Sequence, residues 1–342
     1  MSSNTSPNDA KISAAVDQLA SLEVTDDQTN EKSSDTSAGG ASEDEGLWKP
    51  HQPNEECPVC FVPLPLDERA CTYRVCCGKT ICAGCTMETI RADNVINKKR
   101  AKKKLPPVDN GCPFCRSATK EVKSSYEERI HKGDGRAAYT LACSYREGDA
   151  DIDVTKDEAK SLELLHHAAD DLSYSGAASY LGYVYSMVDN GHKDETKGRK
   201  YLEDAVTMGD VKARFFLGFI EAQNDNIDLA IRHWKLAAAA GDTVSMKHLW
   251  EFFHQGMLEK AEVVKALRVH KETCDAINSV ERERRKLFNE AIESRNDTTL
   301  IAILTSYYDG DITTKQLNKG LKLHKQQGGI TVNQSMEILH QK

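Results

Sequence analysis

The stretch that decides the fold of the first half of this chain reads Cys57-Pro-Val-Cys60, then Cys76-Cys77-Gly-Lys-Thr-Ile-Cys82-Ala-Gly-Cys85, then Cys112-Pro-Phe-Cys115. Eight of the eleven cysteines lie in these 59 residues, as four pairs, with gaps of fifteen residues (61–75) and twenty-six residues (86–111). A Cys-x-x-Cys pair lets two thiolates bind one Zn²⁺ from a single tight turn, and four ligands complete a tetrahedral site. The pattern therefore predicts two zinc ions, with the ligands Cys57, Cys60, Cys76, Cys77, Cys82, Cys85, Cys112 and Cys115.

Disulfides and redox chemistry are the competing interpretations of these cysteines. Disulfides need an oxidising compartment, but residues 1–30 contain no basic segment followed by an apolar one, so we expect no signal peptide. No run of about 18 apolar residues occurs, so we expect no membrane span and no membrane partner. A cytoplasmic or nuclear location is expected, which favours metal binding. A thioredoxin-like motif would need one pair in a βαβ setting, not four.

The acidity of the chain is confined to its N-terminus. Residues 1–47 contain ten acidic and two basic residues, a net charge of -8 that equals the net charge of the whole chain. Such a polar, charged segment buries too little apolar surface to fold, so 1–47 is predicted to be a disordered acidic tail. Ile12, Val16, Leu19 and Leu22 recur at helical spacing. They favour either a short helix that folds on a partner or a transient helix without one.

Residues 53–126 are predicted to form a small α+β zinc-stabilised domain. A chain this short rarely has a sufficient apolar core, and structural zinc contributes about 10–16 kcal/mol in small metallo-domains. The stretch 86–96 has helical character. The basic run that follows, Lys98–Lys104, precedes Leu105-Pro-Pro and is expected to loop out. It is interpreted as a solvated insertion, a nuclear-localisation signal or a phosphate contact.

The cysteine pattern resembles a RING finger. The resemblance implies a cross-brace, in which Cys57, Cys60, Cys82 and Cys85 hold one zinc ion, and Cys76, Cys77, Cys112 and Cys115 hold the other. Common RING fingers have Cys-Gly-His at the middle pair, whereas this chain has Cys77-Gly78-Lys79 and an extra Cys76. This is similar to the all-cysteine RING of the ubiquitin ligase subunit of the Not deadenylase complex. That subclass has Cys-x-Cys-Gly before the third pair, which is one residue longer than the Cys-Cys-Gly of this chain. Cys71 is the alternative ligand to Cys76.

The RING resemblance also implies a surface for a ubiquitin-conjugating enzyme. RING ligases perform no covalent chemistry; they hold the ubiquitin thioester in a reactive pose. The family positions that match are Val59, Pro113 and, on the helix after the third pair, Met87 or Ile90. Arg116 matches the basic residue that contacts both ubiquitin and the conjugating enzyme, a role that suits a guanidinium. The alternative is that these residues only pack the zinc loops.

From Gly135 onward the chain changes to repeated helical segments. Four predicted helices begin with a small residue that is followed, four positions later, by leucine. The pairs are Ala137/Leu141, Ala177/Leu181, Ala213/Leu217 and Ser245/Leu249. Second helices are expected near Lys156, Lys197, Ile227 and Glu259. Two helices end in Gly-Asp, at 209–210 and 241–242, where glycine fits a helix C-terminus and aspartate begins the next helix.

These segments resemble Sel1-like repeats, relatives of tetratricopeptide repeats, over 133–275. The resemblance implies an all-α solenoid that binds proteins. Both modules together, with the closing stretch 264–271, are similar to RING/Sel1 proteins of diatoms. Residues 276–342 are expected to be a helical or partly disordered extension without an assigned role.

The sequence therefore predicts a multi-domain chain whose leading function is that of a RING-type E3 ubiquitin ligase. The zinc module would recruit a conjugating enzyme loaded with ubiquitin, and the solenoid would bind substrate or partner proteins. The first alternative is a non-catalytic zinc-binding adaptor. The second is nucleic-acid binding through Lys98–Lys104, which is disfavoured because no aromatic residues interleave with the lysines.

Overall fold

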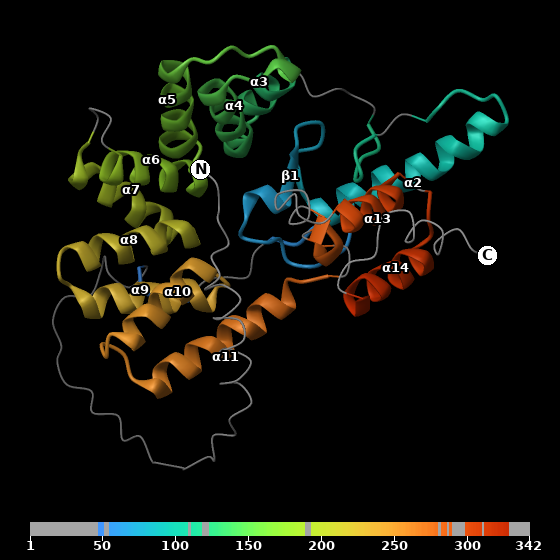
Figure 1. Ribbon diagram of the computed structural model, residues 1–342. Coiled ribbons are helices and arrows are strands. Elements are labelled where there is room, and N and C mark those ends of the chain that lie inside the picture. Colours follow the sequence, from blue (N-terminus) through green and yellow to red (C-terminus); the bar gives the residue numbers. More distant parts are fainter. Residues whose placement is uncertain are drawn as a thin grey trace. The chain divides into compact units, whose positions relative to one another are not determined.

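A computed structural model describes residues 47–50, 55–108, 111–117, 123–188, 193–279, 282–285, 287–288, 298–309 and 311–327 (Figure 1). The predicted acidic tail, apart from residue 47, and the helical pattern at Ile12–Leu22 lie outside these residues. The chain forms two units, Asn54–Ser161 with Ala276–Lys342, and Met1–Pro53 with Leu162–Asp275. Among the described helices, none combines the length and the apolar character that a membrane crossing requires.

The cysteine-rich part of the first unit is built on one hairpin and one long helix. Strands β1 (Cys71–Arg74) and β2 (Lys79–Cys82) pair antiparallel, with Cys71 opposite Cys82. The turn between them is closed by hydrogen bonds from the backbone N–H groups of Cys77 and Gly78 to the Arg74 carbonyl. Gly78 has φ +64°, a left-handed conformation that favours glycine. A short 3₁₀ helix, η1 (Glu68–Ala70), precedes the hairpin.

Helix α2 (Ala83–Lys102) follows β2 directly and is longer than the sequence indicated. The expectation that the basic run loops out is wrong, because Lys98, Lys99, Arg100 and Lys102 lie in the last turns of α2. The physical reason is that lysine and arginine are good helix formers and that cations are favoured at a helix C-terminus. The helix ends at Lys102, with Lys103 as its C-cap, and the chain reverses at Lys104, whose φ is +54°.

Two C-terminal helices, α13 (Thr298–Tyr308) and α14 (Thr314–Gln327), belong to the same unit. They share a buried apolar cluster that includes Ile303, Leu304 and Leu317, against which Met87 of α2 packs. Glu88 of α2 accepts hydrogen bonds from Tyr307 at 3.0 Å and from Arg284 at 3.2 Å. The region to which the sequence assigned no role thus covers one face of α2.

The same unit contains α3 (Lys123–His131), α4 (Gly135–Glu147), the 3₁₀ turn η2 (Ala150–Ile152) and the start of α5 (Glu158–His166). The Tyr73 hydroxyl of β1 donates to Asp134 at 2.7 Å, just before α4. In α5, the Ser161 hydroxyl donates to the Ala142 carbonyl of α4 at 2.8 Å. These bonds join the hairpin to the first helix pair.

The other unit consists of three further helix pairs, preceded by a π-helical turn, η3 (His167–Asp171). The pairs are α6 (Ser175–Met187) with α7 (Glu195–Thr207), α8 (Val211–Gln223) with α9 (Ile227–Ala239), and α10 (Thr243–His254) with α11 (Lys260–Ala276). Each predicted small residue, Ala137, Ala177, Ala213 and Ser245, is the third residue of its helix and is fully buried. The predicted repeat register is therefore confirmed.

Gly-Asp corners connect successive helices, as the sequence predicts. Gly209 has φ +90° and Gly241 has φ +101°, and the aspartate after each glycine donates its N–H to the carbonyl five residues earlier. Asp210 and Asp242 then accept the N–H of Ala213 and Ser245 at 2.8 and 2.7 Å, which caps the next helix. Gly133-Asp134 before α4 makes the same corner, which the sequence analysis missed.

Two glycines lie where α6 and α7 are in close contact. A Cβ atom on Gly198 would lie 2.8 Å from the Ser186 backbone nitrogen and 3.0 Å from the Gly182 carbonyl oxygen. A Cβ atom on Gly182 would lie 2.6 Å from the Leu202 side chain. Only glycine permits this contact, since backbone atoms cannot move aside as a flexible side chain can.

We expect Gly198→Ala to destabilise the protein by about 1–3 kcal/mol through overpacking, despite a gain of up to about 1 kcal/mol in helix propensity. Thermal unfolding measures the change, with Lys200→Ala on the exposed side of α7 as the matched control. A Gly198→Ala protein that unfolds at or above the wild-type temperature would contradict the close contact.

Candidate metal centres

Two loops of the cysteine module have the same backbone geometry. In the first, the N–H of Phe61 donates to the Cys57 carbonyl at 2.8 Å and the N–H of Cys57 donates to the Val62 carbonyl at 2.9 Å. In the second, Arg116 donates to Cys112 and Cys112 donates to Ser117, both at 2.9 Å. Phe61 and Arg116 both have φ +58°, so each Cys-Pro-x-Cys sequence forms a tight knuckle that ends in a left-handed residue.

The other two cysteine pairs lie at the two ends of β2. Cys76 and Cys77 are in the hairpin turn, and Cys82 is both the last residue of β2 and the N-cap of α2. The Cys82 sulfur accepts the N–H of Cys85 at 3.5 Å, which places Cys85 in the first helical turn. Sulfurs at a helix N-terminus face several free N–H groups, an environment that favours thiolates.

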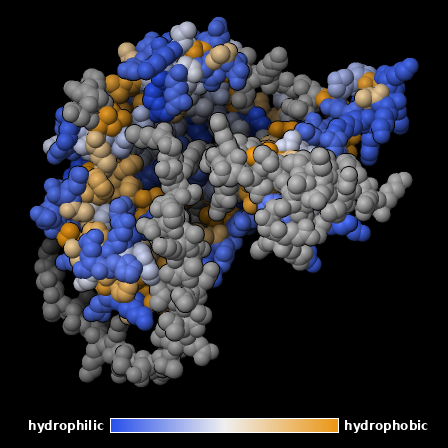
Figure 2. All heavy atoms as spheres, viewed as in Figure 1, coloured by the Kyte–Doolittle hydropathy of each residue, from blue (hydrophilic) through white to orange (hydrophobic). Residues whose placement is uncertain are grey.

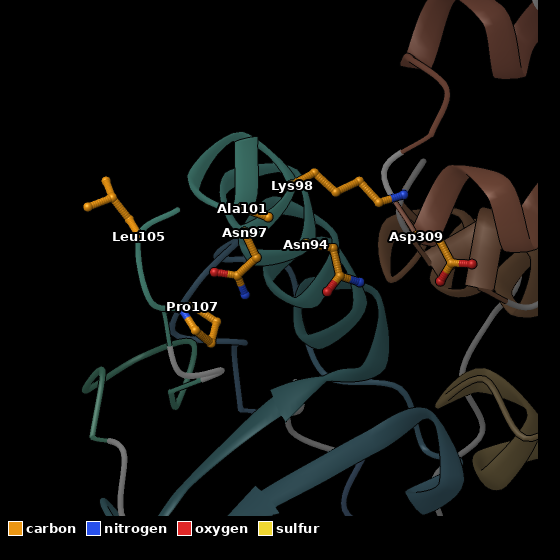
Figure 3. A pocket seen from close by; sticks show the side chains of 7 residues that line it. All are labelled: Asn94, Asn97, Lys98, Ala101, Leu105, Pro107 and Asp309. Carbon is orange, nitrogen blue, oxygen red and sulfur yellow. The ribbon is translucent and has the colours of Figure 1, made fainter. Parts of the chain in front are cut away.

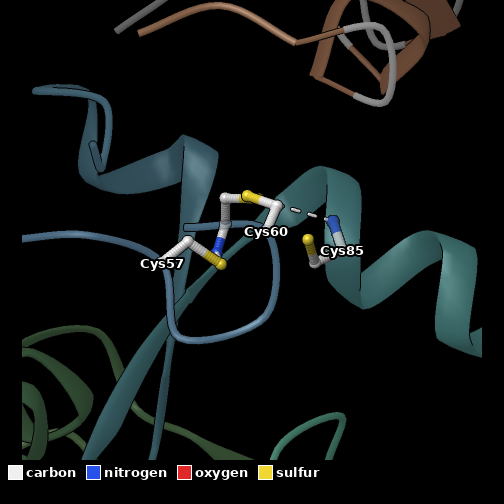
Figure 4. A group of neighbouring side chains, drawn as sticks. Cys57, Cys60 and Cys85 are labelled. Carbon is white, nitrogen blue, oxygen red and sulfur yellow. Dashed lines mark hydrogen bonds between the residues drawn. The ribbon is translucent and has the colours of Figure 1, made fainter. Parts of the chain in front are cut away.

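The structure brings the eight cysteines into two groups of four. Cys57, Cys60, Cys82 and Cys85 form the first group, and Cys76, Cys77, Cys112 and Cys115 form the second, with the sulfurs of each group within 4.8 Å of one another. Figure 4 shows Cys57 and Cys60 on the first knuckle facing Cys85 on α2.

The spacing of the sulfurs fits zinc. A tetrahedron with Zn–S bonds of about 2.3 Å has edges of about 3.8 Å. The separations are 3.9 Å for Cys60–Cys82, 3.8 Å for Cys77–Cys112 and 3.6 Å for Cys76–Cys115. None of the eleven cysteines is in a disulfide. Each group can therefore bind one zinc ion without a change in the backbone.

Cys71, the alternative ligand, lies in neither group. Its thiol donates to the Pro65 carbonyl at 3.7 Å, and burial raises its pKa to about 11. Cys71 is therefore not placed to join the four sulfurs of the second group, which are Cys76, Cys77, Cys112 and Cys115.

Two arginines distant in sequence support the ligand loops, and the sequence analysis missed both. Arg282 donates to the carbonyls of Pro63 at 2.5 Å and Val62 at 3.1 Å, and lies 3.8 Å from the Cys60 sulfur. Arg129 of α3 donates to the Val75 carbonyl at 3.1 Å in the hairpin turn. Each arginine therefore fixes a loop that carries ligands, and Arg282 also offsets the negative charge of the first group.

The residues predicted to contact a conjugating enzyme lie in different environments. Val59 and Arg116 are exposed on the two knuckles, Pro113 is half-buried, and Ile90 is half-buried on α2. Met87 is partly buried against the C-terminal cluster. The knuckles also expose Phe61, at 73%, and Phe114, at 46%, which makes the loop tips an apolar surface.

The C-terminal end of α2 forms a separate, polar surface. A depression of about 610 Å³ is lined by Asn94, Asn97, Lys98, Ala101, Leu105, Pro107 and Asp309, and Figure 3 shows Lys98 extending toward α13. Lys98 pairs with Asp311, and Asn97 bonds to the backbone of Val108 at 2.6 Å. Figure 2 shows this end of the helix, at the upper right, as mostly hydrophilic. It contains no group of metal ligands among the described residues.

Comparison with solved structures finds similar proteins, among them two repeat proteins. One is a Sel1 repeat protein from Oxalobacter formigenes, which is 24% identical with a TM-score of 0.34. The match covers 37% of this chain and 96% of that protein's chain. The other is c5321, a protective antigen present in uropathogenic Escherichia coli strains that has an SLR fold. It is 20% identical with a TM-score of 0.38, and the match covers 60% of this chain and 45% of that protein's chain. No protein-family model and no curated protein matches the chain. The repeat architecture itself is seen in the helix pairs described above.

We expect purified protein to contain two zinc ions, measured by elemental mass spectrometry. Cys76→Ser should reduce the content toward one, because it removes a ligand of the second group. Cys71→Ser, and Cys143→Ser in α4, should leave it at two. Loss of zinc from Cys71→Ser but not from Cys76→Ser would reverse the assignment.

Arg282→Gln should speed the loss of one zinc ion to a chelator by about 10–100-fold, the usual effect of losing a residue that supports a metal ligand. Release is followed with a zinc-sensitive dye. Arg268→Gln, at an exposed arginine of α11, is the control. Equal release from both variants would show that Arg282 does not support the site.

Proposed function

We propose that this chain is a RING-type ubiquitin ligase, in which the cysteine module recruits a conjugating enzyme and the helical repeats bind protein substrates. The order of the ligands carries the proposal. The first group takes the first and third cysteine pairs, and the second takes the second and fourth. This interleaved order is what the RING resemblance implies, and separate zinc fingers that follow one another along a chain would not produce it.

The exposed loop tips support this proposal. Val59, Phe61 and Phe114 place apolar side chains in water at the ends of the two knuckles. Exposed apolar groups gathered on one small module are typical of a protein contact. Arg116 lies at the end of the second knuckle with its side chain exposed, so its guanidinium is accessible to a partner.

The proposed chemistry is positioning. Zinc supplies the rigidity of the loops, and the chain's own residues bind and orient the partner. A guanidinium that donates to two proteins at once restricts the thioester to reactive orientations, which raises the rate without a covalent step. We propose a cytoplasmic or nuclear location, where thiols stay reduced.

A non-catalytic adaptor is the second candidate. It is favoured by the packing of Met87 against the C-terminal cluster, because this removes one of the matching apolar positions from the accessible surface. It is also favoured by Lys79, which stands where common RING fingers have a ligand. In this case both the loop tips and the repeats would bind proteins without ubiquitin transfer.

Arg116→Ala should reduce autoubiquitination by about 10–100-fold, since charge-assisted hydrogen bonds of about 1.5–3 kcal/mol are lost in the reactive pose. The assay uses zinc-loaded full-length protein with a panel of conjugating enzymes. Arg116→Lys keeps the charge but not the planar donors, so an intermediate rate is expected.

Two controls make the ligase assay decisive. Cys82→Ser removes a ligand of the first zinc group and should abolish transfer, whereas Arg268→Ala on α11 should not change it. If protein shown to hold two zinc ions makes no chains with any conjugating enzyme, the ligase proposal fails and the adaptor becomes the better description.

A further inference from the structure

A short turn of the chain, Leu47–Lys49, lies against α8 and α9 in the repeat unit (the short blue segment beside α9 in Figure 1). It is far in sequence from these helices and has no part in the repeat pattern. Three side chains receive it: Arg214 of α8, and Arg232 and His233 of α9. These three residues are called the Trp48 site below.

Arg214 binds the backbone of the turn. Its two terminal nitrogens donate to the carbonyls of Leu47 at 2.7 Å and Lys49 at 3.1 Å. The side chain is only 4% exposed, and no carboxylate pairs with it within the part of the chain that the structure describes. A buried guanidinium needs acceptors, and here two carbonyls of one turn supply them.

The side chain of Trp48 is held by the other two residues. The Arg232 guanidinium lies 3.7 Å from the centre of its ring, and the His233 ring lies 4.6 Å away. His233 is 2% exposed, yet its Nδ1 has no hydrogen-bond partner. Burial, followed by the charge of Arg214, lowers the pKa of His233 to about 4, so its ring is neutral at pH 7, and it lies tilted by 37° to the indole.

The charges around the site favour an acidic ligand. Arg214 and Arg232 both lie at the site and act on His233, whereas Arg199 pairs with Glu203 and Glu221. Glu221 is already bound by Arg199 at 2.5 Å and by Asn226 at 2.8 Å. In the sequence, three acidic residues, Glu43-Asp44-Glu45, precede Trp48 closely.

We propose that the Trp48 site is a peptide-recognition site, that Leu47–Lys49 occupies it in cis, and that partner proteins bind there by displacing this turn with a segment of the same chemistry. That segment is a turn centred on tryptophan and preceded by acidic residues. In this site Arg214 binds two backbone carbonyls of the ligand, and Arg232 and His233 contact its aromatic ring. The inference rests on the proposed protein-binding role of the repeats and is independent of ubiquitin transfer.

The test uses the full chain and a fluorescein-labelled peptide with the sequence of residues 41–53. Trp48→Ala in the protein removes the indole from the site and weakens the hold on the resident turn, so this variant should bind the peptide. The wild-type chain should bind at least tenfold more weakly, because a ligand tethered in cis competes at an effective concentration in the millimolar range. Fluorescence polarisation measures both affinities.

Three changes probe the contacts in the Trp48→Ala protein. Adding Arg214→Gln or the exposed Arg232→Gln should weaken binding at least tenfold, whereas Arg268→Gln should not change it. A peptide with alanine in place of Trp48 should not bind, and one with Glu43, Asp44 and Glu45 changed to neutral amides should bind more weakly. Circular dichroism checks that each variant is folded, and Arg232→Gln keeps the test valid if Arg214→Gln does not fold.

Two results would overturn the proposal. One is equal binding to the wild-type and Trp48→Ala proteins, and the other is binding that neither arginine change alters. Peptide binding by a protein that is inactive in ubiquitin transfer would leave this inference standing and remove only the ligase. Ubiquitin transfer without peptide binding would overturn this inference and leave the ligase proposal standing.

Discussion

The crowding of thiol sulfurs is the constraint on which the cysteine module depends. The buried cluster of the module consists of four cysteines with Leu64 and Ile81, and the side chains packed around it are Cys60, Cys71, Cys76 and Cys77. Even with the buried side chains of Tyr73 and Val75, this is a small apolar core for a domain. Four thiolates within 4.8 Å repel one another, whereas a divalent cation at their centre turns the same geometry into the strongest interaction available. Zinc bound to the two groups would hold the hairpin and the start of α2 together, and with them the surface of α2 that receives α13.

The RING resemblance implied how the cysteine pairs combine into two groups. Local patterns allowed the sequence to predict the pairs themselves, the starts of the repeat helices and the Gly-Asp corners. Each depends on residues within one turn, such as Asp210 capping the N–H of Ala213. Contacts between distant segments could not be predicted in this way. Arg282 reaches the first knuckle from 222 residues beyond Cys60, and its own neighbourhood in the sequence is a run of charges without periodicity. The sequence predicted too short a helix for α2, because the lysines after residue 97 were interpreted as solvated charges in a loop and not as helix-forming residues.

In three places an arginine side chain donates hydrogen bonds to the backbone carbonyls of a turn. The first knuckle, the hairpin turn and the Leu47–Lys49 turn each have carbonyls outside regular helices and strands, and Arg282, Arg129 and Arg214 donate to them. A guanidinium presents several donors in one plane, so one side chain can bind two carbonyls of a turn; an ammonium group cannot match both directions as well. In the first two cases the turn carries metal ligands. In the third it carries a tryptophan, and the bond therefore holds a ligand rather than a zinc loop.

The packing of α2 restricts how the proposed ligase could engage a partner. Glu88 is bound by Tyr307 and Arg284, and Met87 is covered by the C-terminal cluster, so the face of α2 that bears these two residues is already used inside the unit. A conjugating enzyme that docked on that face would have to displace buried residues such as Ile303 and Leu304, each worth roughly 1.5–3 kcal/mol of burial. Contact at the knuckle tips has no such cost, because Val59, Phe61 and Phe114 are already in water. The proposed recruitment surface therefore lies on the two knuckles and Arg116 rather than on the middle of α2.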